Sequence, residues 1–181
     1  MIYEFLADGF EIIEAMAPVD MLRRAKAEVK TVGISKKEIT SSCGIKVISD
    51  ISEEEIDINS VNAIILPGGL QGALNLDSSR TVDKCLEFCA SNNRLICAIC
   101  AAPLVLGRKG LLNGRNAVCF PGFEDELHGA ALSEDFVVRD GNIITAKGAG
   151  VATEFGLKIV EALYGKEMAA KIAKTIQCRD N

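Results

Sequence analysis

The segment LICAICAAPLVLGRK, residues 95–109, decides the fold of this chain. Its first five residues are all apolar, which is the pattern of a strand buried on both faces. Pro103 falls in the first turn of the helix that we expect over residues 102–109, where proline is tolerated. Cys100 therefore lies at a sharp turn from a strand into a helix, the position that presents a nucleophile in many α/β enzymes.

The rest of the chain repeats this alternation of short apolar runs with helical patterns. We expect further strands at residues 2–6, 29–34, 63–66, 117–120, 136–139 and 142–146, with one or two short strands within 41–51. We expect helices at residues 11–25, 81–90, 123–128, 151–164 and 166–176. The pair Asp140-Gly141 predicts a hairpin between the last two strands. This order predicts an α/β protein with a mostly parallel sheet and helices on both faces, in one domain over residues 1–181.

Composition narrows the classes of function. The 181 residues include 20 Lys+Arg and 25 Asp+Glu, a formal charge of −5, and 49% of them are hydrophobic. A mildly acidic balance with no basic stripe disfavours nucleic acid and anionic membranes as partners. No targeting segment is recognisable, and no stretch approaches the ~20 apolar residues of a membrane span. Seven cysteines, an odd number, beside a large core indicate a reduced, cytoplasmic protein rather than a disulfide scaffold.

Cys100 is the sharpest candidate for chemistry. The small residues around it, Ala98, Ala101 and Ala102, suit a tight turn, and the N-terminus of the following helix favours a thiolate. The alternative is that Cys100 is one more buried cysteine. Cys97 completes a C-x-x-C pattern, but it falls inside the strand, so we interpret it as part of the core, as we do Cys85 and Cys89 on one apolar helix face.

Four other features are candidates to assist Cys100. Gly68 and Gly69 end the strand at 63–66, and their N–H groups could stabilise an oxyanion, although an ordinary tight turn has the same sequence. Glu14 lies among apolar residues, and a buried, protonated carboxyl would donate a hydrogen bond to a thiolate; a surface glutamate is the alternative. His128 is the only imidazole, on a short polar segment that nothing in the sequence places near Cys100. Residues 148–150, GAG, form either an anion cradle or a permissive entry into a helix.

Together these segments resemble the ThiJ/PfpI superfamily, also called the DJ-one/PfpI family. The resemblance is carried in order by residues 6–11 (LADGFE), 66–69 (LPGG), 98–103 (AICAAP) and 148–150, followed by the helix at 151–164. It is closest to the family's parkinsonism-associated protein deglycase branch. The resemblance implies a flavodoxin-like three-layer sandwich and a homodimer.

The resemblance also implies a site and an activity. Cys100 would be the reactive thiolate and Glu14 its protonated partner, with the oxyanion site formed by Gly68, Gly69 and Ala101. Members of the family are described as glyoxalase III, deglycases, oxidative-stress sensors and chaperones. The implied substrate is a small dicarbonyl such as methylglyoxal, or its adducts, and no metal or organic cofactor is needed.

Three positions depart from what the family shows. Phe120 stands where many relatives have a histidine that assists proton transfer. Ala101 stands where the peptidase-like branch has a histidine, so peptidase activity is disfavoured. Cys43 falls roughly where the deglycase branch has an arginine reaching across the dimer. Because Phe120 replaces that histidine, a second function stays open: a non-enzymatic redox sensor or chaperone in which Cys100 is oxidised to sulfinate.

Overall fold

A seven-stranded sheet forms the centre of the protein in this computed structural model, which describes residues 1–178. Its strands are β1 (Ile2–Leu6), β2 (Val29–Gly33), β5 (Ile51–Ser52), β6 (Ala63–Leu66), β7 (Leu95–Ile99), β10 (Val137–Asp140) and β11 (Ile143–Ala146). Their order across the sheet is β10-β11-β7-β6-β1-β2-β5. All neighbours pair parallel except β10 and β11, which form the antiparallel hairpin expected at Asp140-Gly141.

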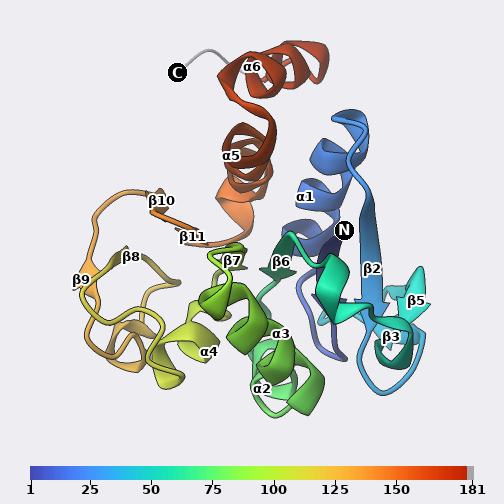
Figure 1. Cartoon of the computed structure of the whole chain (residues 1–181), viewed down its shortest axis with the longest axis vertical. Helices are drawn as coiled ribbons and strands as arrows, with labels where there is room; N and C mark the ends of the chain where they lie inside the picture. Colours follow the sequence, from blue (N-terminus) through green and yellow to red (C-terminus); the bar gives the residue numbers. More distant parts are fainter. Residues whose placement is uncertain (179–181) are drawn as a thin grey trace.

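Helices cover both faces of this sheet (Figure 1). One face carries α1 (Ile12–Arg24) and α5 (Ala152–Tyr164), and α6 (Lys166–Thr175) packs beside α5. The other face carries α2 (Leu70–Asp77), α3 (Arg80–Ser91) and α4 (Pro103–Arg108). Each face has its own buried apolar cluster, because successive strand residues point to opposite sides of the sheet. The flavodoxin-like α/β sandwich predicted from the alternation of strands and helices is confirmed.

Short strand pairs and 3₁₀ turns lie outside the central sheet. A separate antiparallel pair joins β3 (Glu38–Thr40) to β4 (Lys46–Ile48), and a short parallel pair joins β8 (Asn116–Ala117) to β9 (Ala131–Leu132). Single 3₁₀ turns lie at Glu53–Glu55, Ile58–Ser60, Glu124–Glu126 and Ala149–Val151. No helix within residues 1–178 is long and apolar enough to span a membrane.

Three local expectations were wrong, whereas the short strand expected within 41–51 is confirmed by β4. The strand expected at 117–120 is only Asn116–Ala117, since the Phe120 N–H donates to the Cys100 carbonyl at 2.8 Å instead of joining a ladder. The helix expected at 123–128 is one 3₁₀ turn. Helix α2 was not expected at all, because Gly72 weakens its pattern; a Cβ there would come within 2.7 Å of the Phe10 backbone, so this helix needs glycine to pack.

Candidate active site

Cys100 occupies the turn between β7 and α4 with a left-handed backbone conformation, φ +64°. Such a value in a residue other than glycine costs about 1–3 kcal/mol and persists only where the surroundings enforce it. Two backbone hydrogen bonds do so: the Cys100 N–H donates to Ala146 at 2.9 Å, and the Cys100 carbonyl accepts from Phe120 at 2.8 Å. Ala101 and Ala102, buried beside it, leave room for the turn, and Cys100 itself remains partly exposed.

Glu14 reaches this turn from the first turn of α1. Its side chain is 1% exposed, so the buried alternative is the one the structure contains. Its Oε2 accepts a hydrogen bond from the Gly68 N–H at 2.9 Å. Glu11 caps the same helix by accepting from the Glu14 N–H at 2.8 Å, which fixes where the Glu14 side chain begins.

Gly68 lies between the carboxyl and the thiol. A Cβ added at Gly68 would come within 2.5 Å of Glu14 Oε2 and 2.6 Å of Cys100 Cβ. Glycine is therefore required by the close approach of these two side chains. Gly69, at φ +78°, is the N-cap residue of α2, and its N–H is one of the donors that act on Cys100.

Burial dominates the electrostatics of the Glu14–Cys100 pair. Desolvation raises the pKa of Glu14 to about 7, against lowering contributions from Cys100 and from the N–H groups of Gly68 and Ala149. Desolvation and the Glu14 charge raise the pKa of Cys100 to about 12, while the N–H groups of Gly69 and Ala101 lower it. The raised pKa of Cys100 runs against the thiolate that we expected from the N-terminus of the following helix, because burial outweighs the N–H groups there.

Residues 148–150 complete the surroundings of Glu14. A Cβ at Gly148 would lie 3.7 Å from Glu14 Oε1 and 3.3 Å from the Phe120 ring. The Ala149 N–H is among the donors that lower the pKa of Glu14. Gly148 and Ala149 thus lie beside the carboxyl, a role that sequence reasoning missed because the two segments are far apart along the chain.

His128 does not join this group. It is exposed just beyond the 3₁₀ turn Glu124–Glu126, and its charge acts on Glu126. In the part of the chain that the structure describes, no hydrogen bond links His128 to Cys100 or Glu14. The Phe120 side chain, which is 47% exposed, lies next to Gly148. This is the position at which the family resemblance led us to note the absence of a histidine.

The other six cysteines lie outside this site, and the three that we expected in the core are buried there. Cys97, Cys85 and Cys89 are buried, and burial raises the pKa of each. Cys119 is buried too, Cys178 is partly exposed, and Cys43 is exposed beside Ser41 in the β3–β4 turn. Within residues 1–178, no group of three or more His, Cys, Asp or Glu side chains is arranged to hold a metal ion.

The fold and this turn define a class: α/β proteins with a cysteine at a strand-to-helix turn and a buried glutamate beside it. The profile of the DJ-1/PfpI family matches residues 1–162. The chain belongs to the DJ-1/PfpI family.

Individual relatives agree with this assignment. The chain is 37% identical over 180 residues to a Parkinson disease protein 7 homolog of Danio rerio, covering 97% of this chain and 95% of the relative. It is 40% identical to Protein DJ-1 homolog B of Arabidopsis thaliana, covering 93% of this chain but only 39% of that longer protein. It is 32% identical to the Glutathione-independent glyoxalase DJR-1.2 of Caenorhabditis elegans, covering 92% and 89%. The structure of oxidized Toxoplasma gondii DJ-1 superposes with a TM-score of 0.93 at 35% identity, covering 97% of each chain.

Proposed function

We propose that this protein is a cysteine-dependent glyoxalase III or deglycase that acts on methylglyoxal-type carbonyls or their adducts. The observation that carries the proposal is the strained turn at Cys100, which holds a partly exposed sulfur near the buried carboxyl of Glu14. A relative named as a glutathione-independent glyoxalase, at 32% identity, supports the choice of substrate class.

In the first half of the proposed reaction, Glu14 carries the proton of the Cys100 thiol to the substrate. The Glu14 carboxylate accepts the thiol proton as the Cys100 sulfur attacks the aldehyde carbon, and then gives that proton to the carbonyl oxygen. The product is a hemithioacetal. N–H groups at Gly69 and Ala101, with Gly68 holding Glu14 in place, would stabilise the negative oxygen during the attack.

The second half of the reaction is an isomerisation followed by hydrolysis. Glu14 removes the proton from the former aldehyde carbon and returns it to the neighbouring carbon through an enediol, which gives a 2-hydroxy thioester. Water then cleaves the thioester and restores the thiol. One dicarbonyl and one water become one 2-hydroxy acid, so the cycle needs no oxidant and no cofactor.

Three further properties belong to the same proposal. The working form is a homodimer, the location is cytoplasmic, where thiols stay reduced, and the protein is not a peptidase because Ala101 follows the nucleophile. A redox sensor is the second candidate, favoured by Phe120, which supplies no proton-transfer group at the site. There, peroxide would oxidise Cys100 to sulfinate.

Comparison of single-residue variants tests the proposal. We expect wild type and Cys97→Ala to consume methylglyoxal and form lactate at similar rates, and Cys100→Ala to do neither. Equal, slow consumption by wild type and Cys100→Ala would overturn the enzymatic proposal. Mass spectrometry after mild peroxide then tests the sensor: oxidation confined to Cys100 supports it, and oxidation spread over all the cysteines rejects it.

A further inference from the structure

A cavity of about 690 Å³ opens at the end of the sheet opposite Cys100. Its lining includes Ile2 and Leu95, the first residues of β1 and β7, whereas Cys100 follows the last residue of β7. The volume lies within the range of about 300–1,000 Å³ that is usual for small-molecule sites. Ligands of open α/β sheets ordinarily bind at the other end, so nothing in the fold class explains this cavity.

Basic side chains dominate the ionisable lining of the cavity. Arg94, Arg115, Arg139 and Lys26 contribute to it, and Glu28 is the one carboxylate residue among the residues that line it. The chain as a whole carries a formal charge of −5. The excess of positive charge in the cavity therefore runs against the charge of the protein, which favours an anionic ligand.

Two of the three guanidinium groups that line the cavity, those of Arg94 and Arg139, form no ion pair within residues 1–178, while Arg115 pairs with Asp140. Nε of Arg139 donates only to the Gly141 carbonyl, at 3.2 Å, and Arg115 Nη1 lies 3.6 Å from Asp140 Oδ1. Within residues 1–178, no carboxylate lies within 4.0 Å of the side-chain nitrogens of Arg94 or Arg139.

Arginines elsewhere on the surface differ. Arg23, Arg24 and Arg108 each hold a carboxylate at 2.6 to 2.8 Å. An arginine that keeps its donors unpaired beside a cavity retains the planar fork that binds phosphate and carboxylate oxygens.

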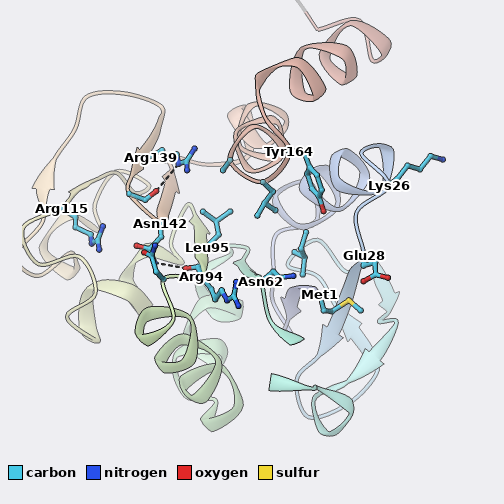
Figure 2. A pocket seen from close by; sticks show the side chains of 15 residues that line it. Met1, Lys26, Glu28, Asn62, Arg94, Leu95, Arg115, Arg139, Asn142 and Tyr164 are labelled. Atoms are coloured by element: carbon cyan, nitrogen blue, oxygen red, sulfur yellow. Dashed lines mark hydrogen bonds between the residues drawn. The ribbon is translucent and has the colours of Figure 1, made fainter. Parts of the chain in front are cut away.

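The cavity has a charged side and a less polar side. Figure 2 shows Arg94, Arg115 and Arg139 around Asn142 on one side of the view, while Lys26 points outward. Ala162, Leu163 and Tyr164, from the end of α5, line the cavity as well. A ligand that fits both sides has a strongly anionic head and an apolar or aromatic body.

We propose that this cavity binds a small organic phosphate. The fork of Arg94 binds the phosphate oxygens, Arg115 and Arg139 add positive charge to the same wall, and the body of the ligand lies along Leu163 and Tyr164. A phosphate dianion carries more negative charge than a monocarboxylate, so it gains more from the excess of positive charge in the cavity. The site is independent of the reaction proposed at Cys100.

Titration calorimetry with phenyl phosphate tests this inference, at 0.15 M salt so that exposed charges are screened. We expect saturable binding with a dissociation constant at or below about 1 mM, at least tenfold tighter than inorganic phosphate or benzoate. Arg94→Gln and the double variant Arg94→Gln/Arg139→Gln should weaken binding at least tenfold, while Lys84→Gln, on the exposed face of α3, should leave it unchanged.

The controls separate this site from the proposed active site. Cys100→Ala should bind phenyl phosphate as wild type does, whatever its activity toward methylglyoxal. Absence of saturable binding, or equal binding by wild type and Arg94→Gln, would overturn the proposal. Circular dichroism establishes that each variant is folded, and because the described residues give the Arg94 side chain no carboxylate partner, its single substitution remains informative even where the double variant does not fold.

Discussion

Two buried glutamates, Glu4 and Glu14, differ in what surrounds their carboxyl groups. Glu4 is 0% exposed and Glu14 is 1% exposed, and burial is the first cause of the raised pKa of each. Glu14 accepts a hydrogen bond from the Gly68 N–H and lies beside Cys100. Neither oxygen of Glu4 has a hydrogen-bond partner among the residues that the structure describes.

The surroundings of Glu4 are those of a core position. It lies on β1 with Thr31 of β2 and Ile65 of β6 as its neighbours in register. An unpartnered carboxyl in such a place is kept neutral and contributes a desolvation cost without a hydrogen bond. The comparison shows that a strongly raised pKa by itself indicates only burial. A candidate catalytic carboxyl also needs reactive or hydrogen-bonding groups beside it, as Glu14 has and Glu4 does not.

Substitution of each glutamate gives the largest contrast. We expect Glu14→Ala to lower kcat/KM for methylglyoxal roughly 10³-fold, since general acid–base groups contribute about 10²–10⁴-fold. Glu4→Gln should leave kcat/KM within about twofold, because Glu4 does not reach Cys100. Steady-state kinetics checks both, and a comparable loss in Glu4→Gln would break the comparison.

The pH dependence of stability separates the two carboxyls next. Both have a pKa in the folded state above the unfolded value of about 4.3, so the unfolded state releases its proton first, and stability falls as pH rises above that value. Each group lowers the free energy of unfolding by about 1.4 kcal/mol per pH unit until the pH reaches its pKa in the folded state.

Urea unfolding between pH 5 and 8 measures this slope in wild type, Glu4→Gln and Glu14→Gln. Relative to wild type, both variants should gain stability as the pH rises from 5, and Glu14→Gln should gain about 2 kcal/mol by pH 7. Above pH 7, where Glu14 is ionised in the folded state, Glu14→Gln should gain no more. A continued gain by Glu14→Gln above pH 7 would show that its carboxyl is still protonated there in the folded protein.

A methyl group at Gly68 tests the partners of Glu14 without removing its charge. In Gly68→Ala the new Cβ would collide with Glu14 Oε2 and Cys100 Cβ, so we expect roughly tenfold lower kcat/KM. Gly150→Ala is the matched control, since a Cβ there meets nothing within 4 Å and, as at Gly68, no positive φ adds strain. Equal kinetics for the two variants would remove Gly68 from the positioning of Glu14.

The sequence predicted the sheet well, because parallel strands are short, fully apolar runs. The predicted strands at 63–66 and 95–99 match β6 and β7 residue for residue. Segments held by side contacts were predicted poorly: helix α2 depends on the contact of Gly72 with Phe10, and Phe120 on its bond to the Cys100 carbonyl. A local sequence pattern cannot predict contacts between residues that are far apart along the chain.

The site was predictable only where one segment carries it. The turn at Cys100 follows from its own flanking residues, but the burial of Glu14 and its proximity to residues 148–149 depend on three distant segments. The burial of Glu4 also comes from folding, because Glu4 shares with Ile2 the face of the sheet that α1 and α5 cover. The arginines at 94, 115 and 139 likewise form a cluster only after folding.

Replacement of Phe120 by histidine should have the smallest effect, and it asks whether Glu14 works alone. The Phe120 ring lies against Gly148, next to Glu14, so an imidazole there would add a second proton carrier with a pKa near neutrality. We expect Phe120→His to raise kcat for methylglyoxal threefold to fivefold, and to restore part of the activity that Glu14→Ala loses. Phe120→Leu controls for loss of the ring and should bring no gain; a gain in Phe120→Leu equal to that in Phe120→His would mean that space, and not proton transfer, limits the site.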